Sequence, residues 1–388
     1  MNHTFKESSN EQATVSRHAQ STSRLSSVDF LRGLALTIVI LDHVDFWTDG
    51  GGFIRSWTLM GLGFSDAAEA FVFLSGLTLG WAYGSKISEG SFLLIQKRVL
   101  LRALQIYSGY LATVTIVVLM GNWTSLHSFP RYAPDHSTIF AALSLTYQPF
   151  GFGILCFYIV VLPFMPILLF LFHRQLWLAV GLSIAFYAAV QISPSFNLPD
   201  HNGGVWSFNP FAWQFLIVLG AVVGYRSRVE GKSIPKLKIL TLFSLVFVVY
   251  VMLINKGDLF MNDGQLHLLQ LRADLFSPHS PLISKTDLGP LRLLHSFAVF
   301  YLVYQILHVK QTCWLRTFSK PFIVSGRNSL AVYCVGIVLA YCAAVVFAWT
   351  GITWVTVVVV PVDACLLQFA IAYWLDHERM RCNSRNVS

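Results

Sequence analysis

An arginine and a histidine lie in the first apolar run of the chain, where ionisable side chains are rare. The run begins Asp-Phe-Leu-Arg-Gly, which includes Arg32, and His43 lies near its far end. At 100° per residue, the eleven residues between them make about three helical turns, so both side chains share one helix face about 16 Å apart. Histidine titrates near neutral pH and is the usual general base for an alcohol nucleophile. We therefore expect His43 to be catalytic, with an interhelical hydrogen bond as the alternative.

Two carboxylates begin the second apolar run. Asp66 and Glu69 are three residues apart in Gly-Phe-Ser-Asp-Ala-Ala-Glu, on one face of a predicted helix. Glu69 could orient the His43 ring and stabilise its imidazolium form, as the carboxylate of a catalytic triad does. Asp66 could act beside it, or it could cap the helix and favour the helix dipole. We place both carboxylates with His43 in the expected catalytic set.

These residues must be positioned by membrane helices, because the chain is too apolar for a soluble domain. Of its 388 residues, 55% are hydrophobic and 12% charged, against roughly 25% charged in soluble domains. About ten apolar runs are long enough to cross the hydrocarbon layer. They are Phe30–Trp47, Ala67–Gly84, Val99–Met120, Phe152–Phe172, Leu176–Ile192, Phe211–Tyr225, Leu237–Ile254, Leu288–His308, Phe322–Phe347 and Ile352–Trp374. The shorter stretch Ile139–Tyr147 is expected to be interfacial or re-entrant.

The expected fold is therefore all-α, a polytopic transmembrane bundle of about ten helices over residues 28–376. It is preceded by a polar, disordered tail of residues 1–27 and followed by a tail of residues 377–388. Lys and Arg gather on one side if both termini are cytoplasmic, which predicts a multi-pass protein of the cell inner (cytoplasmic) membrane. The net charge of +8 then reflects topology, and nucleic acid is not an expected partner.

Several motifs resemble one known family. The first two apolar runs resemble the OpgC family of osmoregulated periplasmic glucan succinyltransferases, within the wider acyltransferase family 3. The resemblance lies in Asp-Phe-Leu-Arg-Gly with His43, followed by Gly-Phe-Ser-Asp-Ala-Ala-Glu and Phe-Val-Phe-Leu-Ser-Gly. The resemblance continues in Phe208–Gln214, Gly289–His295 and Gly326–Leu330. It implies transfer of an acyl group from cytoplasmic coenzyme A to a sugar hydroxyl across the membrane. Arg32 and His43 match the family's arginine and histidine pair, whereas Arg98 and Arg102 are spaced one residue wider than its paired-arginine motif.

On the predicted topology the polar residues form two layers. Cations at the inner face could hold the phosphates of coenzyme A, and they are Arg32, Lys97, Arg98 and Arg102. Polar and aromatic groups at the outer helix ends could bind the sugar, and they are Asn209, Trp213, Gln214, Arg292 and His295. Each has a simpler alternative, since Trp213 is also typical of an interfacial aromatic belt and Arg98 of a topology signal.

The sequence thus predicts a membrane O-acyltransferase for succinylation or acetylation of a glucan or other polysaccharide. Succinyl-coenzyme A or acetyl-coenzyme A would be its co-substrate. We expect no bound cofactor and no metal, because the chain contains no Cys-x-x-Cys pair and no His-Glu-x-x-His. The alternative is a transporter whose intramembrane His and Asp residues relay protons or bind substrate.

The topology can be checked with reporter fusions. Because the expected inner loops hold most Lys and Arg, a reporter that is active only in the periplasm should be active after Asn262 and silent after Lys232. The reverse pattern would show that the spans have been miscounted by one.

Overall fold

The computed structural model describes residues 26–48, 53–88, 90–123, 136–256, 280–309 and 313–385. The expected N-terminal tail therefore lies outside these residues except for its last two, as does Asn262. The described chain is helical, and its only β pairing is an isolated bridge between Pro199 and Val205. The all-α prediction is confirmed for this part of the chain.

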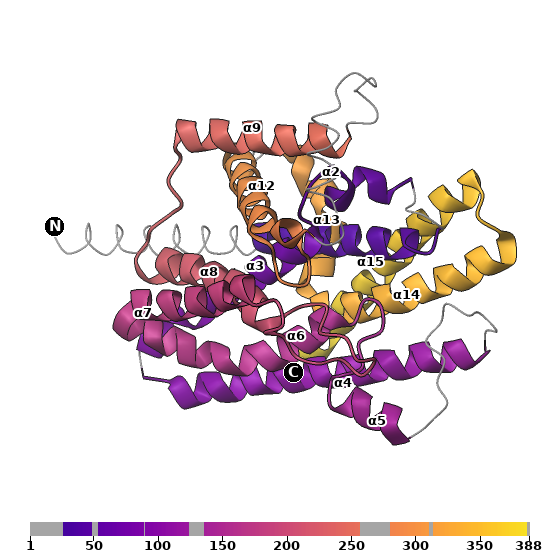
Figure 1. Cartoon of the computed structure of the whole chain (residues 1–388), viewed down its shortest axis with the longest axis horizontal. Coiled ribbons are helices and arrows are strands. Elements are labelled where there is room, and N and C mark those ends of the chain that lie inside the picture. Colours follow the sequence, from indigo (N-terminus) through magenta and orange to yellow (C-terminus); the bar gives the residue numbers. More distant parts are fainter. Residues whose placement is uncertain are drawn as a thin grey trace.

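The elements begin with a helix over residues 26–45, which carries Arg32 and His43. The short pieces are η1 (Arg55–Trp57), α2 (Leu59–Leu62), α5 (His136–Leu143), η2 (Leu162–Phe164) and η3 (Pro281–Ile283). The longer helices are α3 (Ala67–Ser88), α4 (Phe92–Trp123), α6 (Gly153–Val161), α7 (Met165–Ile192), α8 (Pro210–Val229), α9 (Lys238–Asn255), α12 (Pro290–Val309), α13 (Cys313–Arg327), α14 (Ser329–Thr350) and α15 (Trp354–Arg385). Figure 1 shows α3 and α8 side by side, and α9 lying across α12.

Six segments of the described chain are long and apolar enough to cross a membrane. They are Phe92–Gly121, Gly153–Ile192, Lys238–Asn255, Pro290–Leu307, Ser329–Thr350 and Trp354–Cys382. Many large apolar side chains on these helices are exposed, Ile239 and Phe243 of α9 among them, which is typical of a lipid-facing surface. These features indicate a membrane protein, while the number of crossings stays a prediction.

The difference between six segments and ten has a local explanation. The predicted spans on either side of Gln175 form one segment, which leaves helical geometry at Gln175 (φ −150°, ψ 80°). Three further predicted spans correspond to the helix of residues 26–45, α3 and α8, which carry charged and polar side chains. The short stretch predicted as interfacial is the eight-residue α5, which is too short to cross.

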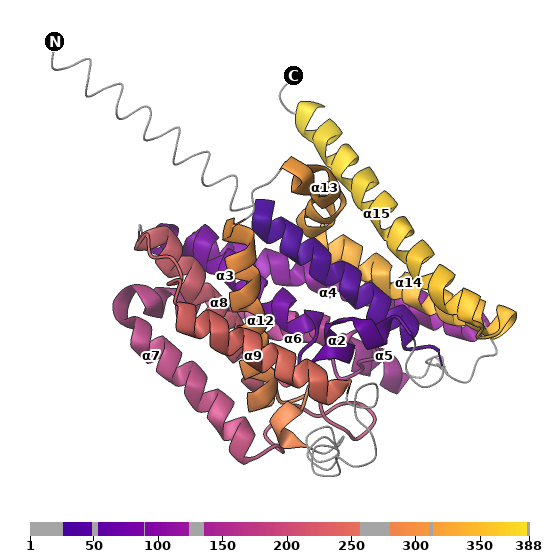
Figure 2. The same cartoon turned by 90° about the horizontal axis from the view of Figure 1, so that it is seen from above.

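One predicted span is wrong, and one helix is longer than its predicted span. The span predicted over Phe322–Phe347 is broken at Asn328, which lies between the end of α13 at Arg327 and the start of α14 at Ser329. The Asn328 side chain donates to the Val324 carbonyl at 3.1 Å, and such local bonds compete with helix continuation. The last helix also runs past Trp374 to Arg385, into the predicted C-terminal tail. In Figure 2 the start of the helix of residues 26–45, α13 and the end of α15 lie on the same side of the molecule.

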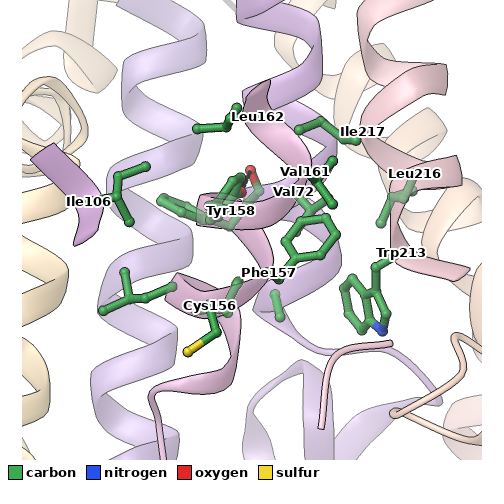
Figure 3. Close-up of a cluster of buried hydrophobic side chains, with 14 of the residues drawn as sticks. Val72, Ile106, Cys156, Phe157, Tyr158, Val161, Leu162, Trp213, Leu216 and Ile217 are labelled. Atoms are coloured by element: carbon green, nitrogen blue, oxygen red, sulfur yellow. Dashed lines mark hydrogen bonds between the residues drawn. The ribbon is translucent and has the colours of Figure 1, made fainter. Parts of the chain in front are cut away.

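Helices α3 and α8 touch through their backbones. An added Cβ would lie 2.0 Å from the Ala221 carbonyl oxygen at Gly80, and 2.1 Å from the Phe73 carbonyl oxygen at Gly220. The same close approach recurs four residues along each helix, at Gly76 and at Gly224. Such paired small-xxx-small patterns let membrane helices pack at backbone distance. The hydrophobic core beside this pair includes Tyr158 of α6 and Trp213 of α8 (Figure 3).

This contact makes a direct prediction about stability. Gly80→Val should destabilise the folded protein by about 1–3 kcal/mol or more, because the new side chain meets the backbone of α8. Gly181→Val in α7 is the matched control, since no atom lies within 4 Å of a Cβ at that position. The measurement is the thermal loss of monodisperse protein in detergent. Equal stability of the two variants would contradict the close contact.

Candidate functional site

His43 has one ring nitrogen bonded and the other left as an acceptor. Its Nδ1 lies 2.6 Å from the Val39 carbonyl oxygen on the same helix. A carbonyl can only accept, so in the neutral ring Nδ1 carries the proton and Nε2 carries the lone pair. The ring packs on Phe150 with centroids 4.9 Å apart. At Gly151 (φ +90°), a Cβ would lie 3.2 Å from the His43 ring. These contacts hold the imidazole in the tautomer with its proton on Nδ1 and its lone pair on Nε2.

A cavity lies beside His43, between the helix of residues 26–45, α14 and α15. Its volume is about 10 Å³, which is room for about one water molecule. Its lining is mostly aliphatic, with three polar side chains, and consists of Leu36, Val39, Ile40, His43, Val332, Tyr333, Gly336, Ile337 and Gln368. The Tyr333 hydroxyl is already used, because it donates to the Gly151 carbonyl at 2.6 Å.

Arg32 lies on the same helix face, beyond the cavity. Its guanidinium carbon lies 5.8 Å from the centre of the Phe71 ring, and its buried Nε has no hydrogen-bond partner among the described residues. Arg32 is within electrostatic reach of Arg102 and Tyr158. Two like charges within electrostatic reach repel each other, so an anion between them would be stabilised.

The predicted donor-binding cations separate into two groups. Arg102 lies near Arg32 and donates to Gln105 at 3.2 Å. Lys97 and Arg98, about one turn earlier on α4, are exposed. Arg102 is exposed as well, and what distinguishes it is that it lies within electrostatic reach of Arg32.

Asp66 is a helix cap, which was one of its two predicted roles. Its Oδ1 accepts from the Ala68 backbone N–H at 2.7 Å, and Glu69 Oε2 accepts from the Asp66 backbone N–H at 2.8 Å. This reciprocal pair is a capping box that satisfies two of the free N–H groups at the start of α3. The predicted catalytic role of Asp66 has no support in these contacts.

Glu69 does not orient His43, contrary to the prediction. Its Oε1 accepts from Arg292 Nε, and Asp66 Oδ2 accepts from Arg292 Nη2 at 2.9 Å and from Lys285 Nζ at 2.6 Å. Glu69 is fully buried, and the Arg292 side chain is 8% exposed. A buried arginine makes this arrangement stable because it neutralises the carboxylates with fixed, charge-assisted hydrogen bonds.

The predicted sugar-binding residues are structural, beginning with Trp213. Trp213 is fully buried, and its indole N–H donates to the Lys285 carbonyl at 2.9 Å. In Figure 3 it packs beside Phe157 in the core, so it neither stacks on a sugar nor lies in an interfacial belt. Asn209 caps α8 through the Phe211 N–H and donates to Asp287 Oδ1 at 3.0 Å.

The other three members of that set are also engaged in the protein interior. Gln214 exchanges two hydrogen bonds with Ser183, at 2.6 and 2.9 Å. Arg292 belongs to the ion network with Asp66 and Glu69. His295 is 2% exposed and its Nδ1 lies 2.7 Å from Ser65 Oγ. The sequence identified these positions as special, but it could not distinguish a polar group that holds helices together from one that binds substrate.

Gln368 was missed by the sequence reasoning. It is 1% exposed, lines the cavity beside His43, and its Oε1 has no partner among the described residues. The sequence feature that could have identified Gln368 is a lone amide within the apolar run Ile352–Trp374, because polar groups inside a span are costly and tend to be functional.

The structure is a bundle of apolar, membrane-type helices in which the neutral ring of His43, with its lone pair on Nε2, lies beside a small, mostly aliphatic pocket. A comparison with protein families matches residues 24–380, nearly the whole chain, to the OpgC protein family. The chain belongs to the OpgC family, and this membership suggests a transferase. No curated protein matches the chain in a sequence comparison.

The ion network makes a prediction of its own. Arg292→Met should destabilise the protein by about 3–5 kcal/mol, because it leaves two buried carboxylates without their main partner. Adding Asp66→Asn and Glu69→Gln should restore much of this loss by removing the charges. Arg381→Met is the control, since its ion pair with Glu378 is exposed and worth little. Retention of monodisperse protein on size exclusion measures the effect, and a triple variant as unstable as Arg292→Met would contradict it.

Proposed function

We propose that the protein is a membrane O-acyltransferase. It transfers a succinyl, or an acetyl, group from acyl-coenzyme A to a hydroxyl of a periplasmic glucan or related polysaccharide. Family membership supports a transferase of the OpgC type rather than the transporter alternative. The observation that carries the proposal is the His43 ring, whose bond to the Val39 carbonyl leaves Nε2 as an acceptor beside a cavity.

The proposed reaction is a direct transfer in which His43 moves one proton. Nε2 of His43 takes the proton of the acceptor hydroxyl while that oxygen attacks the thioester carbonyl carbon. A new C–O bond forms and the C–S bond breaks, so the sulfur leaves with the electron pair of that bond. The imidazolium then returns its proton to the sulfur, and the products are the glycan ester and the free thiol of coenzyme A.

The cations at the other end of the site would hold the donor. Arg32 has a buried Nε with no partner among the described residues, and Arg102 lies within its electrostatic reach. Guanidinium groups bind phosphate oxygens through forked hydrogen bonds. We assign the phosphates of coenzyme A to this pair; Arg102 is exposed on α4, as are Lys97 and Arg98 about one turn earlier.

The acceptor would approach from the aromatic side of His43. Phe46 and Phe150 stack with centroids 3.9 Å apart and are 43% and 37% exposed. Phe150 also touches the His43 ring. An exposed aromatic face can pack against the apolar face of a sugar ring while hydroxyls point outward. This pair replaces Trp213 as the proposed carbohydrate platform.

The function is tested by removing the base. His43→Ala should lower transfer of radiolabelled succinyl from succinyl-coenzyme A to glucan by about 100-fold or more, with the protein still folded in the membrane. His173→Ala is the matched control, because His173 is exposed on α7, and its activity should be unchanged. Normal glucan labelling by His43→Ala would refute the mechanism.

A further inference from the structure

The turn of Pro149–Phe152 lies against His43. It is closed by a 3.0 Å hydrogen bond between the backbones of its first and last residues, and Gly151 adopts φ +90° within it. Glycine reaches that backbone conformation without steric cost, which is why it is the usual residue at such a turn position. The turn places the Phe150 ring on the His43 ring, with centroids 4.9 Å apart. The backbone of the turn therefore sets what surrounds the imidazole.

Two tyrosine hydroxyls of α14 hold this turn in place. Tyr333 donates to the Gly151 carbonyl at 2.6 Å, and Tyr341 donates to the Phe150 carbonyl at 3.1 Å. Both tyrosines are buried. Because the two carbonyls belong to successive residues, the turn cannot move relative to α14 without losing a hydrogen bond, and a buried polar group left unpaired is costly.

Gly151 leaves space beside Nε2 of His43. A Cβ on Gly151 would lie 3.3 Å from Nε2, 3.2 Å from Cδ2 of the same ring and 3.2 Å from Cδ1 of Ile337. Favourable contacts between carbon atoms are about 3.5–4.0 Å long, so a methyl group there would press on the imidazole. Nδ1 cannot replace Nε2 as the acceptor, because it is bonded to the Val39 carbonyl. The absence of a side chain at Gly151 therefore keeps open the nitrogen that carries the lone pair.

We propose that Gly151 and Tyr333 are positioning residues of the reaction: Gly151 keeps Nε2 of His43 open to the acceptor hydroxyl, and Tyr333 fixes the turn that carries it. The inference rests on the proposed role of His43 as the base. Neither residue exchanges a proton with the substrate. The effect of Gly151 should therefore appear in any reaction of Nε2, including one that needs neither glucan nor acyl-coenzyme A.

The reactivity of Nε2 is measured with diethyl pyrocarbonate, which carbethoxylates a free imidazole nitrogen, on the full chain in nanodiscs. His43 is partly exposed, and mass spectrometry of its peptide gives the rate of modification. Gly151→Ala should abolish this modification and lower the kcat of succinyl transfer to glucan about 100-fold. Gly203→Ala is the matched control, because Gly203 also has a positive φ (+80°) but no atom lies within 4 Å of its Cβ position. It should keep both the modification rate and the kcat of the wild type.

Tyr333→Phe tests the hold on the turn without changing the residue at position 151. It removes the hydroxyl and keeps the ring, so it should lower kcat about tenfold, as expected for one lost hydrogen bond. The KM for succinyl-coenzyme A should stay unchanged, because the turn positions the base and not the donor. Tyr187→Phe removes a similar bond, to the Leu288 carbonyl at 3.0 Å, and should leave kcat unchanged.

The outcomes separate this inference from the proposed function. Modification of His43 in Gly151→Ala at the wild-type rate, or equal losses in Gly151→Ala and Gly203→Ala, would overturn the inference. If Gly151→Ala does not fold, Tyr333→Phe decides, and an unchanged kcat in that variant would overturn it. Protection of His43 in Gly151→Ala alone, without any glucan labelling by the wild type, would support the inference and refute the proposed acceptor.

Discussion

The Arg292 guanidinium holds two carboxylates inside the protein, and the positions of several helices depend on it. Each of these charges would cost several kcal/mol if buried alone, so none can be removed or displaced without its partners. Asp66 and Glu69 also form the cap of α3, while Arg292 belongs to α12. The network therefore fixes where α3 begins and which face of α12 meets it.

The same network also fixes the position of α8 through hydrogen bonds. Lys285, which pairs with Asp66, accepts the Trp213 indole N–H through its backbone carbonyl, and Asp287 accepts from Asn209. The segment before α12 is thereby tied to the start of α8 and to α3. Once the two helices are aligned at this end, the glycines of α3 and α8 bring their backbones into contact along the rest of their length.

The proposed reactive face lies on a different helix contact. Gly33 packs against the Phe322 backbone and Gly326 against the Asp29 backbone, with an ion pair between Asp29 and Arg327 at 3.5 Å. The first helix thus rests on α13, and its opposite end carries His43 beside α14. His43 bonds to a backbone carbonyl and not to a carboxylate. Such a partner fixes the tautomer, but it stabilises the imidazolium less than the charged group of a catalytic triad would.

The sequence by itself determined the helical class, the positions of most helices and the Arg32–His43 face. These follow from apolar run length and helical period, which are local properties. It also indicated the break near Gln175, but it placed the start of α14 seven residues early and missed Gln368. Only the tertiary structure decided the roles of Glu69, Asn209 and Trp213, because a polar group in a membrane helix is costly whether it binds substrate or another helix. The difference lies in its partners, and those come from segments far apart in the chain.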